Sequence, residues 1–147
     1  MKAVIFCLLV GLTLTYNAGS AVSYARKYCR NYNPKYHNYA SSGGDCANFV
    51  SQCLVAGGMS FSNCGGKDNK GMIPYVPNLE NCLSNNGWKK SYGRNGSFRA
   101  GYPFFIPGSH AMIATSVNGG SLTFCGHTND RCDSSMGFMS NWAYYYL

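Results

Sequence analysis

The stretch Gly44-Asp45-Cys46-Ala47-Asn48-Phe49-Val50-Ser51-Gln52-Cys53-Leu54 decides the fold, because it places a cysteine at the first turn of a predicted helix. Apolar side chains at positions 46, 49, 50, 53 and 54 follow helical spacing, which predicts a helix over 46–56 with one buried face. Asp45 is its predicted N-cap, since a carboxylate can accept orphan amide hydrogens, and Gly57-Gly58 predicts its end. Cys46 is therefore expected where unpaired N–H groups and the helix dipole stabilise a thiolate.

The first 20 residues have the pattern of a secretory signal peptide. Lys2 is followed by a short apolar run and then by small residues through Ser20, a pattern too short for a membrane span. We expect cleavage after Ala18 or Ser20, which leaves residues 21–147 as a single domain. The mature protein is expected to be secreted or extracellular, or to reside in the lumen of the secretory or endolysosomal pathway.

The number of cysteines favours a reactive thiol. The chain has 8 cysteines, and loss of Cys7 with the signal peptide leaves an odd number, so that one thiol has no partner. We expect Cys46 to be this thiol, with Cys53 as the alternative. The remaining six are expected to form disulfides, with Cys64–Cys82 favoured because it would fasten a loose loop to a short helix: Cys29, Cys53, Cys64, Cys82, Cys125 and Cys132.

The net charge of the chain indicates which classes of binding partner are favoured. The 12 Lys and Arg residues against 5 Asp and Glu give a formal net charge of +7. The basic residues are scattered, which predicts weak attraction to anionic polymers and does not favour a nucleic-acid partner. No apolar span follows the signal peptide, so the mature chain is expected to have no membrane span. We also expect it to be a monomer.

The order of the predicted elements indicates an α+β fold, with helices first and an antiparallel sheet after them. The predicted elements are a helix over 21–29 capped by Ser20, the helix over 46–56, a short helix over 77–83, a strand over 102–106, a hairpin of 110–117 with 120–127, and a closing strand near the C-terminus.

The hairpin predicts a pair of histidines. Asn118-Gly119 is a strong two-residue turn signal, and that turn would pair residue 117 with 120 and therefore His110 with His127. Residues directly opposite on neighbouring strands have Cβ atoms about 5 Å apart. The other face would pair Ile113 with Phe124 in the core. A three-residue loop would instead put His127 on the face opposite to His110.

A cysteine nucleophile needs a base, and the base needs an orienting partner. We expect His110 to be the base and His127 to fix its tautomer. Asn129 or Asp130 would replace His127 if the register differs. His37 is expected to be a surface histidine.

These residues resemble a known family. The segment from Gly43 to Leu54, followed by Ala-Gly-Gly, is similar to the putative amidase domain family within the NlpC-like, papain-like cysteine peptidase superfamily. His110 at the head of an apolar strand and the segments 127–131 and 32–39 agree with it. The resemblance implies a papain-like fold, a catalytic cysteine and strand histidine, and a third polar residue that by position is His127. It also implies a tyrosine at the oxyanion site, either Tyr39 or Tyr36.

The expected function is a secreted cysteine amidase or endopeptidase without a cofactor. The Cys46 thiolate would attack an amide carbonyl, His110 would transfer the proton to the leaving amine, and the Cys46 N–H would bind the oxyanion. The resemblance implies peptidoglycan stem peptides as the substrate, and another peptide is the alternative. Asp45, Tyr36 and Asn129 are expected to contact the substrate.

Two alternatives remain at this point. Cys125, His127 and Cys132 would suit a metal, although an exported chain favours a disulfide between such cysteines, and we expect no metal. The rival function is a catalytically inactive, disulfide-stabilised binding or toxin-like module of the same fold. An enzyme should have one fast-reacting thiol at mildly acidic pH, whereas the binding module should have none.

Overall fold

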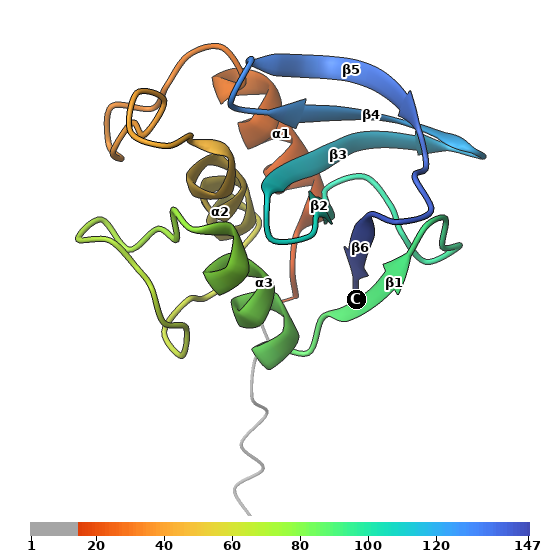
Figure 1. Ribbon diagram of the computed structural model, residues 1–147, viewed down its shortest axis with the longest axis horizontal. Helices are drawn as coiled ribbons and strands as arrows, with labels where there is room; N and C mark the ends of the chain where they lie inside the picture. Colours follow the sequence, from red (N-terminus) through yellow and green to blue (C-terminus); the bar gives the residue numbers. More distant parts are fainter. Residues whose placement is uncertain (1–14) are drawn as a thin grey trace, which may run out of the picture.

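The computed structural model describes residues 15–147 and places three helices beside one antiparallel sheet (Figure 1). This confirms the predicted α+β class, the helix over 46–56 and the short helix near Pro77. β1 and β5 were not predicted. The elements are α1 (Ala18–Tyr28), α2 (Cys46–Ala56), α3 (Val76–Asn85), β1 (Lys89–Tyr92), β2 (Pro103–Ile106), β3 (His110–Asn118), β4 (Ser121–Gly126), β5 (Arg131–Gly137) and β6 (Ala143–Tyr146).

The six strands lie in the order β1-β6-β2-β3-β4-β5. Phe105 is paired with Ala111 on one side and with Ala143 on the other, and side chains alternate along a strand, so these residues share one face of the sheet. Tyr145 lies on the same face, and its hydroxyl donates to Glu80 of α3. α1 and α2 also pack against β3 and β4. The helices therefore cover the face that carries Ala111.

Aromatic side chains form the core on the opposite face. Phe104 stacks on Tyr144 with 5.4 Å between ring centroids and an interplanar angle of 4°. Phe98 and Phe138 pack edge-on or tilted against this pair. The closing strand β6 belongs to this core, as its aromatic sequence predicts, because Tyr144 is fully buried.

The first helix begins earlier than the sequence predicts. Its N-cap is Asn17 rather than Ser20, and the Asn17 side chain accepts from the Ser20 N–H at 2.9 Å. The Tyr16 hydroxyl donates to the Gly101 carbonyl at 2.7 Å, and its ring packs edge-on against Trp88. Residues 16–20, assigned to the signal peptide by sequence, are thus part of the packed domain. The rest of that predicted segment, residues 1–14, lies outside the described residues.

The hairpin of β3 and β4 has a different register from the predicted one. Asn118 pairs with Ser121, so the loop is Gly119-Gly120 rather than Asn118-Gly119. Gly119 has φ of +61°, a conformation that glycine adopts without a steric penalty. A bulge between Ala114 and Ser116 shifts the register again, since a bulge places an extra residue in one strand.

These two shifts overturn the predicted cross-strand pairs. Ile113 pairs with Cys125, not Phe124. The strand β4 ends at Gly126, and the predicted pairing of His110 with His127 does not form.

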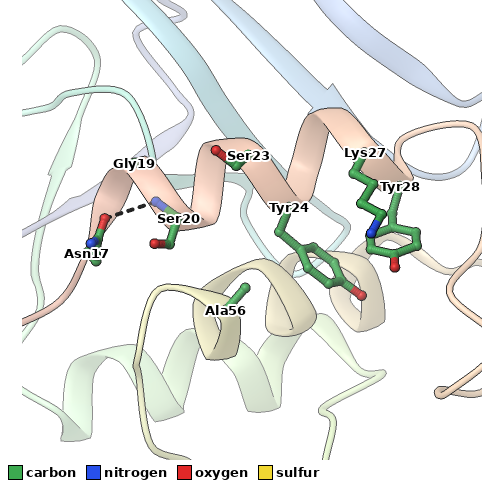
Figure 2. A pocket seen from close by; sticks show the side chains of 8 residues that line it. All are labelled: Asn17, Gly19, Ser20, Ser23, Tyr24, Lys27, Tyr28 and Ala56. Atoms are coloured by element: carbon green, nitrogen blue, oxygen red, sulfur yellow. Dashed lines mark hydrogen bonds between the residues drawn. The ribbon is translucent and has the colours of Figure 1, made fainter.

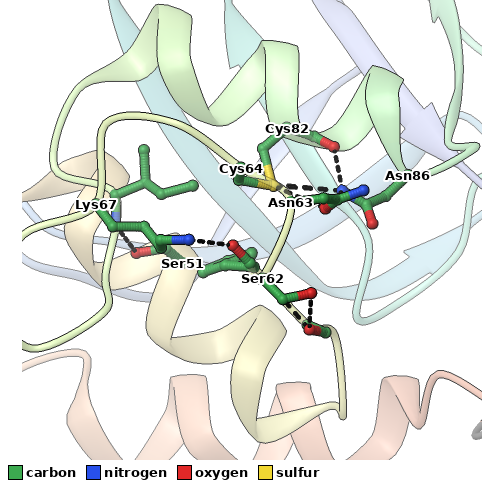
Figure 3. The surroundings of a disulfide bond; sticks show 10 residues. Ser51, Ser62, Asn63, Cys64, Lys67, Cys82 and Asn86 are labelled. Atoms are coloured by element: carbon green, nitrogen blue, oxygen red, sulfur yellow. Dashed lines mark hydrogen bonds between the residues drawn. A yellow bond between two sulfur atoms is a disulfide. The ribbon is translucent and has the colours of Figure 1, made fainter.

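Two disulfides are present in residues 15–147. Cys64–Cys82 is confirmed as the bridge between the loop before α3 and α3 itself (Figure 3). The Asn86 side chain closes this corner by donating to the Cys82 carbonyl at 2.8 Å. Cys29–Cys132 joins the end of α1 to β5. No helix in this part of the chain is long and apolar enough to cross a membrane.

Candidate functional site

Cys46 is the first residue of α2, has no disulfide partner and is 8% exposed. The chain reaches it through Gly43 and Gly44, with φ of +98° and +107°. A Cβ on Gly44 would lie 3.1 Å from Thr128 Oγ1, so this turn needs glycine both for its conformation and for its close approach to the β4–β5 connection. The sequence prediction of an unpaired cysteine at this helix start is confirmed.

The protonation of Cys46 differs from the prediction. Burial raises the pKa of the thiol, the N–H groups of Ala111, Ala47 and Cys46 itself lower it, and the charge of Asp45 raises it again. Desolvation disfavours the charged form of any buried group, and here it outweighs the helix terminus. Cys46 is therefore a thiol at neutral pH, and the predicted ready-made thiolate is wrong for this conformation.

Asp45 is buried and does not cap α2 with its side chain. Its Oδ1 accepts from the Tyr39 N–H and from the Asn48 side-chain amide, each at 2.9 Å, and its Oδ2 lies 2.5 Å from His127 Nδ1. Both oxygens are used inside the protein. The prediction that the Asp45 side chain caps the helix is wrong, and its contact with the substrate stays a prediction.

His127 is 1% exposed and lies against Asp45, the residue before Cys46. Its ring is stacked between Tyr32 and Phe49, with centroid distances of 4.1 and 3.9 Å. Nδ1 contacts Asp45, and Nε2 lies 2.8 Å from the Tyr28 carbonyl. With both ring nitrogens occupied, His127 does not orient His110, contrary to the prediction.

His110 is the first residue of β3, is partly buried, and pairs with Ile106 of the neighbouring strand β2. Burial lowers the pKa of its imidazole, so the ring is neutral at neutral pH and able to accept a proton. Alternation along β3 puts its side chain on the face opposite to Ala111. Within residues 15–147 no hydrogen bond joins its ring to the Cys46 sulfur, although the Ala111 N–H, one residue along, approaches that sulfur.

Glu80 supports the turn that presents His110, and sequence reasoning missed it. Its Oε2 accepts from the Gly108 N–H at 3.0 Å, and its Oε1 accepts from the Tyr145 hydroxyl at 3.3 Å. A single glutamate on a short helix carries no sequence signal for such a contact. The Asp45–His127 pair was also missed, although both residues were expected near the candidate site, Asp45 before Cys46 and His127 beside His110.

The remaining predicted residues surround the site at a distance. The Tyr39 hydroxyl donates to Asp68 at 2.9 Å, and because tyrosine has one O–H, it is not available to an oxyanion in this arrangement. Tyr36 is partly buried with Lys35 over its ring. Asn129 is exposed in the turn after β4 with φ of +63°, and Asp130 accepts from the Tyr32 hydroxyl. The substrate contacts of Tyr36 and Asn129 stay predictions.

The predicted third disulfide does not form. Cys53 and Cys125 are fully buried and unpaired, because each is held in the packed interface of α2 with the sheet, where cysteine serves as a small apolar side chain. Burial raises the pKa of the Cys53 thiol well above its usual value. Cys132 is bonded to Cys29, which removes it from the alternative metal set with Cys125 and His127.

An open groove of about 640 Å³ lies between α1 and the end of α2 (Figure 2). Ser20, Tyr24, Lys27 and Ala56 line it. Neither Cys46 nor His110 contributes to this groove, so it is separate from the candidate site.

Comparisons with known proteins show the family to which the chain belongs. The family model described as "Putative amidase domain" matches residues 15–100, which is more than half of the chain, and the chain belongs to this family. A segment of 48 residues is 44% identical to the "Uncharacterized protein YhbB" of Bacillus subtilis (strain 168). That segment covers 33% of this chain and 14% of YhbB, so the similarity concerns a small part of that protein.

Proposed function

We propose that this member of the putative amidase domain family is an exported cysteine hydrolase that cleaves amide bonds with Cys46 as its nucleophile. The observation that carries the proposal is the position of Cys46, unpaired at the first residue of α2, with backbone N–H groups of Ala47 and Ala111 near its sulfur. Such N–H groups can stabilise negative charge on sulfur or on a developing oxyanion.

The chemistry starts from the thiol. The Cys46 sulfur attacks the amide carbonyl carbon while His110 accepts the thiol proton, and the carbonyl oxygen becomes an oxyanion held by the Cys46 N–H. His110 then gives the proton to the leaving amine, and a thioester remains on Cys46. Water hydrolyses this thioester, with His110 taking a proton from the water, and releases the carboxylic acid and the free thiol.

His110 has to approach the sulfur in the substrate complex. Hydrogen bonds of catalytic groups are often long in the free enzyme and tighten when substrate binds. His110 is the first residue of its strand, directly after a turn. Because its side chain extends from the face of the sheet opposite to Ala111, its ring reaches the sulfur only if this turn moves in the substrate complex, and such a movement breaks no more than the terminal pair with Ile106. Of the three histidines, His127 is enclosed and His37 is exposed beside Asn69, which leaves His110 as the base.

The proposed substrate is the stem peptide of peptidoglycan. The proposed fold of the enzyme is papain-like, of the NlpC-like type. The five carboxylates of the chain all accept hydrogen bonds within the protein, and among residues 15–147 only Arg26 forms an ion pair with one of them besides His127. The other Lys and Arg side chains of residues 15–147 therefore present an uncompensated positive surface, which suits an anionic polymer.

The test is digestion of purified peptidoglycan with the mature protein, followed by mass analysis of the released fragments. We expect fragments that have gained one water per cleaved amide bond, with none from Cys46→Ala. Fragments cut at glycosidic bonds, or equal release by Cys46→Ala, would contradict the proposal.

One observation favours the inactive binding module, namely the raised pKa of a Cys46 thiol that does not contact His110. The same digestion separates the two functions. The binding module would sediment with peptidoglycan and leave it uncut.

A further inference from the structure

The contacts of His127 determine how many protons its imidazole ring and the Asp45 carboxylate share. A neutral imidazole has one N–H donor, whereas the imidazolium has two. Nε2 faces the Tyr28 carbonyl at 2.8 Å, and a carbonyl oxygen can only accept. Nε2 must therefore carry a proton, and a second proton must lie in the 2.5 Å contact between Nδ1 and Asp45 Oδ2.

The position of this second proton decides the charge of the pair. On Asp45 it would make both groups neutral, and on His127 it would make an imidazolium beside a carboxylate. Asp45 Oδ1 accepts two further hydrogen bonds, from the Tyr39 N–H and the Asn48 amide. Donors to a carboxylate favour its charged form, so the proton belongs on His127.

The ionised pair is directly attached to the nucleophile. Asp45 precedes Cys46 in the chain, and its charge disfavours the thiolate. A cation on the far side of Asp45 reduces that effect, because opposite charges at short range largely cancel at a third group. The pair also ties the end of β4 to the Tyr39 backbone and to the first turn of α2.

We infer that His127 is a buried imidazolium that positions the turn before Cys46 and compensates the charge of Asp45, so that the Cys46 thiol loses its proton more readily. His127 thus acts through Asp45 and is a positioning residue. The inference rests on the proposed function only in one respect, namely that Cys46 is the nucleophile whose reactivity the pair affects. The groups that face His127 are Asp45 before α2, Tyr32 from the connector with Asp130 on its hydroxyl, and the Tyr28 carbonyl of α1.

The test measures alkylation of Cys46 by iodoacetamide as a function of pH, with peptide mapping to assign the label. His127→Gln keeps one N–H for Asp45 but removes the positive charge. We expect its alkylation midpoint to move to higher pH, with a rate at neutral pH lower by roughly tenfold. The exposed His37 provides the matched control, because His37→Gln removes a histidine without touching Asp45 and should leave the midpoint unchanged.

A double variant separates charge compensation from a merely structural role. In Asp45→Asn/His127→Gln both charges are gone, so the midpoint should return toward the wild-type value although the hydrogen bonds are altered. A midpoint that stays as high as in His127→Gln, or moves higher, would overturn the inference. Alkylation does not require amide cleavage, so failure of the proposed hydrolase function would leave this result intact.

The wild-type protein gives an independent readout if the variants do not fold. Nitrogen NMR of histidine-labelled protein at neutral pH should show protons on both ring nitrogens of His127. One protonated nitrogen, together with a protonated Asp45 carboxyl in the infrared spectrum, would identify the neutral pair and overturn the inference.

Discussion

Burial has opposite consequences for the two residues that would exchange a proton. It raises the pKa of the Cys46 thiol and lowers the pKa of the His110 imidazole, since in each case it disfavours the charged form. Both groups are then neutral at neutral pH, one a proton donor and the other an acceptor. Such a pair suits proton transfer during attack rather than a stable thiolate–imidazolium pair.

The pH dependence of turnover should show which state reacts. Neutral His110 is the proposed base. Because its pKa is lowered, the neutral form persists at pH values below the usual histidine pKa of about 6.5. We expect kcat/KM to rise with pH through a midpoint below that value and then to stay level through neutral pH. Measurement on a soluble stem-peptide fragment checks this expectation, with circular dichroism at each pH to confirm folding. A rate that rises only at alkaline pH would mean that Cys46 has to ionise before attack.

Replacement of His110, the proposed base, should reduce turnover strongly while leaving the stability of the fold almost unchanged. General-base assistance contributes roughly 100- to 10,000-fold, and His110→Ala should lose turnover within that range. Its unfolding midpoint should change little, because the ring makes no hydrogen bond in the described part of the chain. Turnover of His110→Ala within a few-fold of wild type would remove His110 from the mechanism.

At the scale of elements, the sequence predicted the features that depend on residues close together in the chain. The helical stripe and Gly57 defined α2, and the Cys64–Cys82 bridge followed from a loop that needed fastening. The β3–β4 register did not follow, because Gly119 and Gly120 permit more than one two-residue turn and no residue pattern marks the bulge after Ala114. The true partners of His127 depend on that register, so this part of the site could not be predicted.

The Cys64–Cys82 bridge should stabilise the fold by restricting the unfolded chain. Its two cysteines are 18 residues apart, and closure of a loop of this size is worth about 3 kcal/mol. We expect Cys64→Ala/Cys82→Ala to lower the free energy of unfolding in urea by about that amount. A reducing agent supplies the control, since reduced wild type and the reduced double variant should differ much less. Equal stability of the oxidised proteins would contradict the role of the bridge.

At the scale of the whole molecule, the helices and the sheet are joined near the start of the described chain. Tyr16 connects to the Gly101 carbonyl, and the Asn17 N–H donates to the Gly57 carbonyl at 2.7 Å. These contacts link α1, the end of α2 and the loop before β2. Cleavage after Ala18 or Ser20 would remove both contacts, so we propose that the signal peptide expected from the sequence, where it is cleaved, ends before Tyr16.

Two truncated proteins test this boundary. A chain that starts at Thr15 retains the contacts of Tyr16 and the Asn17 cap, whereas a chain that starts at Ala21 loses both. The cap alone is worth about 1 kcal/mol, and we expect the shorter chain to lose at least about 2 kcal/mol once the Tyr16 ring is included. Urea unfolding measures the difference. Equal stability of the two chains would return the boundary to residue 20.

The central claim is that Cys46 forms a covalent bond to the substrate carbonyl, and trapping of that bond tests it most directly. The mature protein is mixed with a stem-peptide fragment, quenched with acid within one turnover, digested with pepsin and mapped by mass spectrometry. We predict a thioester on the peptide that contains Cys46, which disappears on treatment with hydroxylamine and is absent from Cys46→Ala. Release of cleaved fragments without any adduct at Cys46, and with full activity in Cys46→Ala, would contradict the claim.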